Sequence, residues 1–118
     1  MKVVTLYRPV GKKELELIKD SGFKRFPPRL EWQPIFYQVM NRDYAEQIAR
    51  QWNTEDEFSG FEGHVLSFDL AEDFVQRYPV HNVGGEIHNE LWIPSNELED
   101  FNDQIKGLIR IESSFYRE

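Results

Sequence analysis

The chain has 118 residues, of which 40% are hydrophobic and 30% charged, so it fits one globular domain spanning residues 1–118 and not a disordered chain. Its formal net charge is −7 and its basic residues are scattered, which argues against a protein that binds the phosphate backbone of a nucleic acid. It contains no cysteine, which excludes disulfides and cysteine-based zinc sites. It has no apolar run of membrane-spanning length and no secretory signal, so we expect a cytoplasmic protein without a membrane span.

The first half of the chain predicts two strands, each followed by a helix. Residues 3–9 form a strand whose side chains alternate between two faces, and residues 12–20 carry a narrow apolar stripe at helical spacing. Residues 35–40 predict a second strand. Asn41 then provides a natural N-cap for a helix that is expected to run to about Trp52 with one apolar face.

The second half predicts more strands and two further helical segments. Residues 64–70 indicate a strand, and residues 71–78 indicate one or two helical turns. Residues 96–105 predict a helix, with Asn96 and Glu99 at the spacing of a capping box, and residues 108–115 predict a final strand. Strands and helices that alternate in this way, with connections of mixed length, favour an α+β fold.

The stretch 81–94 holds two of the three histidines of the chain. Gly84 and Gly85 indicate a turn at which a ligand could approach the backbone. The residues after them predict a strand that ends at Pro94, with two sets of side chains on its opposite faces: His88, Glu90 and Trp92 on one, and Ile87, Leu91 and Ile93 on the other.

Two charged loops allow more than one interpretation. Lys24, Arg25 and Arg29 lie around two prolines and are best explained as a solvated loop, with a pocket for a phosphate-bearing ligand as the alternative. The acidic loop 53–63 is also best explained as solvated, because its carboxylates, within residues 55–62, lack the spacing of a calcium loop.

Standard catalytic and metal-binding motifs are absent from the sequence. No serine lies in a Gly-x-Ser-x-Gly elbow, and no glycine-rich phosphate loop is present. His81 and His88 could ligate zinc only with a further partner such as Glu86 or Glu90, and their spacing is not a known ligand signature. We therefore predict no metal site.

Several short motifs, taken in chain order, follow a known pattern. They are Leu6-Tyr7-Arg8 on the first strand, Gly22-Phe23 after the first helix, Phe36-Tyr37 on the second strand, Ala45 and Ala49 in the next helix, and His88-Asn89-Glu90 on a late strand. With these motifs the chain resembles the ADP-ribosyltransferase-like families, especially small uncharacterised bacterial proteins that carry an ADP-ribosylation label. The resemblance covers nearly the whole length, but His88 stands where those families have Gln or Glu.

The resemblance implies a fold and a ligand. The fold is a split, mostly antiparallel sheet with two principal helices, and the ligand is NAD, consumed in ADP-ribosyl transfer to an acceptor. In this scheme Arg8, with Tyr7 beside it, holds the dinucleotide through its phosphates or ribose, and Tyr37 stacks against nicotinamide. Glu90 then stabilises the oxocarbenium-like centre as nicotinamide leaves, and His88 acts as general base.

Two functions remain open at this stage. One is an NAD-using enzyme in which Arg8, Tyr37 and Glu90 meet in one concave site, helped by His88. The other is a non-catalytic module that keeps the fold and binds a protein partner through a cleft or a sheet edge. The structure can separate them by showing whether the three side chains converge.

Overall fold

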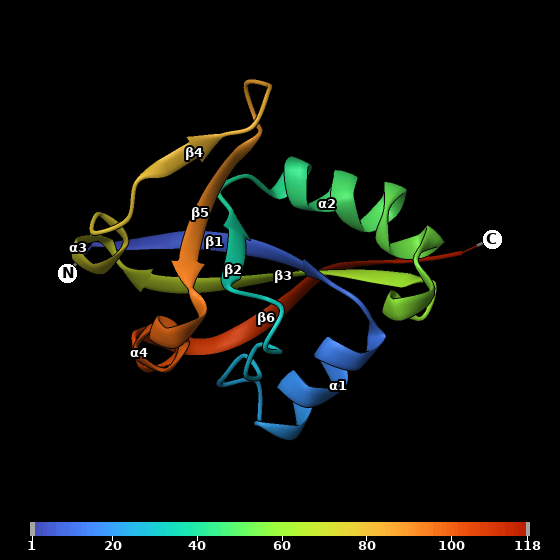
Figure 1. The fold of residues 1–118 in the computed structure, drawn as a ribbon, viewed down its shortest axis with the longest axis horizontal. Helices are drawn as coiled ribbons and strands as arrows, with labels where there is room; N and C mark the ends of the chain where they lie inside the picture. Colours follow the sequence, from blue (N-terminus) through green and yellow to red (C-terminus); the bar gives the residue numbers. More distant parts are fainter. Residues whose placement is uncertain (1, 118) are drawn as a thin grey trace.

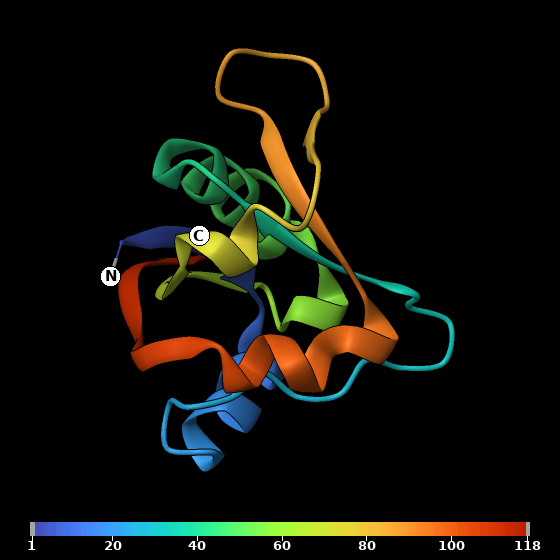
Figure 2. The same cartoon turned by 90° about the vertical axis from the view of Figure 1, so that its left-hand side faces the viewer.

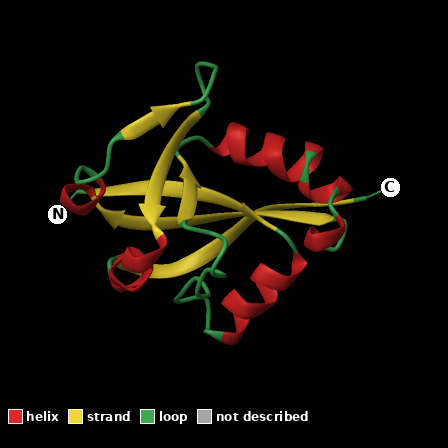
Figure 3. Cartoon of the chain, viewed as in Figure 1, coloured by secondary structure: helices red, strands yellow, loops and turns green. Residues whose placement is uncertain are grey.

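The computed structural model describes residues 2–117, and within them helices pack against an antiparallel sheet of six strands in the order β4-β5-β2-β1-β3-β6 (Figure 1). The strands are β1 (Val3–Val10), β2 (Ile35–Val39), β3 (Glu62–Ala71), β4 (Val80–Asn82), β5 (Asn89–Pro94) and β6 (Ile105–Tyr116). The helices are α1 (Lys12–Asp20), α2 (Arg42–Gln51), α3 (Glu72–Val75) and α4 (Leu98–Asp103), of which α1 and α2 are the longest (Figure 3). The expected α+β class, compact single domain and antiparallel pairing are confirmed.

The sheet consists of two well-paired halves. β1 pairs with β3 along its whole length, and β2 pairs with β5 along its whole length. Between the halves, β1 and β2 are joined at the pair Tyr7–Val39. The six strands therefore form one continuous antiparallel sheet whose two halves meet at a narrow join between β1 and β2.

Helices cover the two faces of the sheet unequally. Figure 2 shows α2 on one side of the strands, with α1 and α4 on the other. The side that α2 covers, called here the α2 face, has a small core around Val39, Ala45 and Val65. The opposite side, the main-core face, holds the larger core and is closed by α1, α3 and α4.

Four phenylalanines fill the centre of the main-core face. The ring centroids of Phe26 and Phe68 lie 4.9 Å apart, and those of Phe36 and Phe101 lie 5.5 Å apart, in edge-on arrangements that aromatic pairs favour. Each of these side chains is almost fully buried, which contributes about 1.5–3 kcal/mol apiece. Because β2 contributes Phe36, this core fixes the orientation of β2 and therefore of Tyr37 on its other face.

Some predicted boundaries are wrong. His88 lies in a turn and not in a strand, because Gly84 takes a positive φ of 134° and the chain reverses before β5 begins. Gly107 does not end the last helix but lies inside β6 with a φ of 76°, in a stretch where the pairing with β3 shifts register. The capping box does not form, since α4 begins only at Leu98 and has no side-chain cap.

Candidate functional site

Glu90 on β5 is the centre of a cluster of side chains on the α2 face. Its Oε1 accepts a hydrogen bond of 2.9 Å from the indole Nε1–H of Trp92. Its Oε2 accepts a hydrogen bond from the hydroxyl of Tyr44 on α2. Burial, followed by this bond to Glu90, raises the pKa of the Tyr44 hydroxyl far above its ordinary value, so Tyr44 stays a proton donor. The carboxylate is thus held in a fixed orientation from two sides.

Two further aromatic rings pack against Trp92 beside this carboxylate. The imidazole of His81 on β4 stacks on the indole of Trp92, with centroids 3.8 Å apart and planes 6° from parallel. The ring of Tyr37 on β2 meets the indole edge-on at 5.8 Å. Tyr37 is 44% exposed, so its ring is available to a ligand. We call Tyr37, Tyr44, His81, Glu90 and Trp92 the Glu90 cluster.

The register of the sheet explains why these residues meet. His81 pairs with Glu90, Glu90 with Val39, and Val39 with Tyr7, which makes a row across four neighbouring strands. Trp92 pairs with Tyr37 in the next row on the same face. Because side chains alternate along a strand, Leu91 and Ile93 point the other way into the main core.

The start of α2 places Tyr44 over this row. Asn41 is the N-cap, as predicted, and its side chain accepts hydrogen bonds from the backbone N–H groups of Asp43 at 2.8 Å and Tyr44 at 3.3 Å. This cap fixes the first turn of the helix, from which the hydroxyl of Tyr44 reaches Glu90.

His88 lies beside the Glu90 cluster without contacting Glu90 directly. Its Nε2 is 3.0 Å from Oε1 of Gln47 on α2, and its ring centroid is 4.7 Å from that of Tyr44. A Cβ atom on Gly85 would lie 2.7 Å from Nδ1 of His88, so glycine is needed there for the histidine to take this position. Tyr44 therefore connects His88 to Glu90.

The side chain of Arg8 points to the main-core face, away from Glu90. Its Nε and Nη2 atoms bind the carboxylate of Glu14 at 2.6 and 2.9 Å, and its Nη1 donates to the backbone oxygen of Tyr37 at 2.7 Å. The guanidinium also lies 4.4 Å from the centre of the Phe36 ring. Arg8 is 8% exposed, and its hydrogen bonds join β1 to α1 and to β2. The structure brings Tyr37 and Glu90 together but does not bring Arg8 to them, so the convergence of all three side chains that was expected of the NAD-using enzyme is not met.

Tyr7 is on the same face as Glu90. It is partly buried against the small core beneath α2 and pairs with Val39 at the join of the two half-sheets. Val39 separates it from Glu90 in the row across the strands. Tyr7 therefore packs in the small core of the α2 face, next to the Glu90 cluster.

Within residues 2–117, the two charged loops form neither the phosphate pocket nor the metal site that the sequence analysis weighed for them. Arg25 pairs with Glu99 at 2.8 Å and Asp103 at 3.0 Å, whereas Arg29 lies against Phe36, so the basic residues of this loop do not converge. The acidic loop folds into two short 3₁₀ helices. Across residues 2–117, no group of three or more His, Asp or Glu side chains is arranged to hold a metal ion, and no helix is long and apolar enough to span a membrane.

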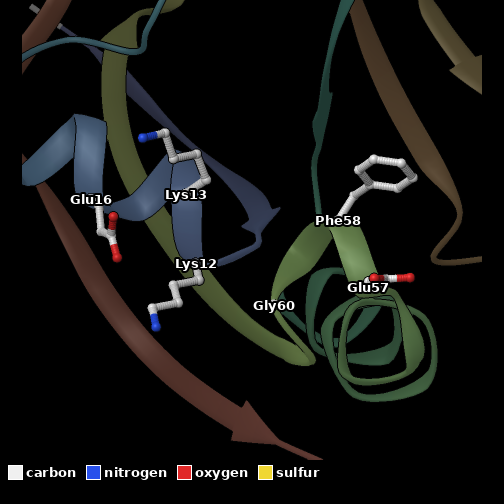
Figure 4. A pocket seen from close by; sticks show the side chains of 6 residues that line it. All are labelled: Lys12, Lys13, Glu16, Glu57, Phe58 and Gly60. Carbon is white, nitrogen blue, oxygen red and sulfur yellow. The ribbon is translucent and has the colours of Figure 1, made fainter.

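Two surface depressions lie away from the Glu90 cluster. One, of about 250 Å³, lies between α1 and the loop after α2, and is lined by Lys12, Lys13, Glu16, Glu57, Phe58 and Gly60 (Figure 4). The other, of about 530 Å³, lies at the end of β6 and is lined by Arg50, Thr54, Glu55, Phe115, Tyr116 and Arg117. Neither contains a residue that the sequence singled out as catalytic or ligand-binding.

The sequence placed Trp92 on the face of Glu90, as the structure has it, but did not indicate that Tyr44 and His81 meet these two residues. Alternation along β5 signals that Trp92 shares a face with Glu90. The position of Tyr44 three residues after a strong N-cap signals only that it lies in the first helical turn, and nothing in the sequence specifies which strand that turn covers.

Comparison of the chain with models of protein families, with curated proteins and with solved structures finds no match. No relative therefore supplies a fold family, an activity or a ligand. A functional proposal for this chain depends on the chemistry of its own side chains.

Proposed function

We propose that the Glu90 cluster binds a nucleotide, with NAD as the candidate ligand and ADP-ribosyl transfer as the candidate reaction. The observation that carries this proposal is the ordered carboxylate of Glu90, which Tyr44 and Trp92 hold and beside which Tyr37 and His81 pack against Trp92. Aromatic faces suit a nicotinamide or adenine ring, and a fixed carboxylate suits the hydroxyls of a ribose.

Glu90 has acceptor capacity left for a ligand. Trp92 and Tyr44 each donate one hydrogen bond to a different oxygen, and a carboxylate oxygen can accept more than one. A ribose hydroxyl bound to Glu90 would bring the carboxylate close to the sugar carbon that carries nicotinamide. Negative charge there stabilises the cationic sugar as the bond from carbon to the nicotinamide nitrogen breaks.

His88 has a free ring nitrogen in this scheme. If its Nε2–H donates to Gln47, its Nδ1 is unprotonated and can take the proton that the acceptor loses when it bonds to the sugar. The proposal assigns Arg8 to the fold, because Glu14 and the backbone of Tyr37 already use its hydrogen-bond donors. It assigns no residue to the phosphates of the dinucleotide.

The alternative function is a non-catalytic module that binds a protein partner. It is favoured by the exposed apolar side chains beside the cluster, since Val80 is 53% and Val83 47% exposed on and next to the edge strand β4. An edge strand can accept a strand from a partner, with main-chain hydrogen bonds supplying affinity. In that case Tyr37 would be a contact residue rather than a stacking platform for nicotinamide.

A matched pair of variants tests the nucleotide proposal. Glu90→Gln removes the charge of the cluster, and Glu97→Gln removes the charge of a carboxylate that also accepts a tyrosine hydroxyl, from Tyr78 at 2.7 Å, next to the main core. We expect wild type and Glu97→Gln to bind labelled NAD and release nicotinamide, and Glu90→Gln to lose release by about 100-fold or more. No binding of NAD by the wild type at millimolar concentration would exclude the proposal and leave the protein-binding alternative.

A further inference from the structure

A serine, a histidine and a glutamate form a relay at the other end of the sheet from the Glu90 cluster. Oγ of Ser114 on β6 lies 2.7 Å from Nδ1 of His64 on β3. Nε2 of the same imidazole lies 3.0 Å from Oε1 of Glu62. We propose that Ser114 is a nucleophile toward small acyl esters, with His64 as its general base and Glu62 as the residue that positions His64.

The fold assembles this relay from residues far apart in sequence. Ser114 and His64 are directly paired across β3 and β6, and Glu62 lies two residues before His64 on the same face of its strand. None of the three lies in a recognised catalytic motif, because strand pairing and not a local turn brings them together. Nucleophile, base and orienting carboxylate are recognised by geometry and not by chain order.

The contacts of His64 fix where its proton lies. An ionised carboxylate can only accept, so the hydrogen bond between Glu62 and Nε2 places the proton of the neutral imidazole on Nε2. Nδ1 is then an acceptor, and the Ser114 hydroxyl must donate to it. This is the arrangement that a general base requires. His64 is 4% exposed and so is held rigidly, whereas Ser114 is exposed to solvent.

Ser114 is exposed on the edge strand β6, and its neighbour Tyr116 borders the depression at the end of β6, which the three residues of the relay do not themselves line. The ring of Tyr116 meets the imidazole of His64 edge-on at 5.7 Å and also lines the depression of about 530 Å³. Because β6 is an edge strand, alternate backbone N–H groups along it have no partner in the sheet. Such groups can donate to the carbonyl oxygen of a bound ester as negative charge develops on it.

The reaction follows from these positions. Oγ of Ser114 bonds to the carbonyl carbon of the ester while its proton passes to Nδ1 of His64. The bond from that carbon to the alcohol oxygen breaks, and the alcohol leaves with the proton from Nδ1. Water then adds to the acyl-serine with His64 again as base, which releases the carboxylic acid and restores the Ser114 hydroxyl.

Ser113 provides a matched control. It is the neighbour of Ser114 in β6, but its Oγ donates to Oε2 of Glu46 at 2.8 Å on the α2 face and has no imidazole partner. Substitution of either serine by alanine removes one hydroxyl from the same strand. A difference in reactivity between Ser114→Ala and Ser113→Ala therefore reflects the loss of the contact between Ser114 and His64 and not a general effect on β6.

The experiment treats the full chain with a fluorophosphonate probe and maps the adduct by mass spectrometry, with hydrolysis of p-nitrophenyl acetate measured in parallel. We expect an adduct on Ser114 in wild type and Ser113→Ala, none in Ser114→Ala, and labelling slowed by about 100-fold in His64→Gln. Glu62→Gln should slow labelling while its thermal unfolding midpoint stays close to that of wild type. No adduct on the wild type, or labelling that persists in Ser114→Ala, would overturn the proposal. No nucleotide is involved, so this outcome is independent of NAD binding.

Discussion

Tyr44 connects α2 to β5 through the hydrogen bond that its hydroxyl donates to Glu90. A hydrogen bond to a charged acceptor contributes about 1.5–3 kcal/mol, and the Tyr44 side chain is buried. The same bond and burial raise the pKa of Tyr44 above the value of about 10 that it has in the unfolded chain. A group with a raised folded pKa contributes stability that is fully present below its unfolded pKa and lost as the pH rises toward the folded one.

We therefore predict that Tyr44→Phe lowers the free energy of unfolding by about 1.5–3 kcal/mol at pH 8 and that the gap to wild type narrows above about pH 10. Urea unfolding at pH 8 and pH 11 measures both effects. Tyr78→Phe should behave in the same direction, because burial and Glu97 raise the pKa of Tyr78 to about 12. A gap between wild type and Tyr44→Phe that is equal at both pH values would contradict this account of the bond.

Arg8 shows how a residue that resembles a ligand-binding arginine can be part of the fold. Its ion pair with Glu14 is largely buried, and removal of one partner from such a pair costs about 3–5 kcal/mol. We predict that Arg8→Met loses about 3 kcal/mol of stability in urea unfolding, and that Arg8→Met with Glu14→Met regains part of this loss because no lone carboxylate remains.

The same Arg8→Met variant, measured where it is folded, should bind NAD as the wild type does. If it instead keeps its stability and loses NAD binding, Arg8 contacts the ligand and the assignment to the fold is wrong. Sequence alone could not decide whether Arg8 serves the fold or the ligand. Alternation along β1 shows only that Arg8 and Tyr7 point to opposite faces, and it does not show that Arg8 binds Glu14 on α1.

At the scale of elements, β1, α1, β2 and α2 lie close to where the sequence placed them. The clearest case is α2, whose N-cap at Asn41 and apolar face are both readable locally. The errors fall where tertiary pairing overrides local signals. β6 begins at Ile105 and runs through Gly107, because β3 pairs with it from Ile105 onward. His88 lies outside β5 because the turn after β4 extends to it.

The contact of α2 with β3 depends on Gly63. A Cβ atom there would lie 2.6 Å from the backbone oxygen of Ala49 and 2.7 Å from Cβ of Asn53, too close for either to remain in place. We predict that Gly63→Ala destabilises the protein by about 1–3 kcal/mol, because α2 must move away from the strand. Thermal and urea unfolding measure the loss.

Gly107→Ala is the comparison for this prediction. Its Cβ would meet no atom within 4 Å, so the substitution adds only the strain of a φ of 76°, about 1–2 kcal/mol. Displacement of α2 should also move Tyr44, so Gly63→Ala is expected to weaken NAD binding while Gly107→Ala leaves it unchanged. Equal NAD affinity in the two variants would show that the α2–β3 contact does not position the Glu90 cluster.

At the scale of the whole molecule, the narrow join between β1 and β2 decides which side chains can share a site. The fold class and the shared face of Glu90 and Trp92 follow from local patterns in the sequence. The convergence of Tyr37, Tyr44 and His81 on them does not, because it requires the strand order and the side of the sheet that α2 covers. The contact between Ser114 and His64 does not follow from local sequence patterns either, since it depends on the register of β3 against β6.

The indole N–H resonances of the tryptophans provide the most direct test of nucleotide binding at the Glu90 cluster. Trp92 donates its Nε1–H to Glu90, whereas Trp32 and Trp52 lie outside the cluster and are 74% and 59% exposed. In a titration with NAD followed by two-dimensional NMR, the Trp92 resonance should shift and saturate while those of Trp32 and Trp52 stay in place. No shift of Trp92 at millimolar NAD, or equal shifts of all three resonances, would contradict the proposed site.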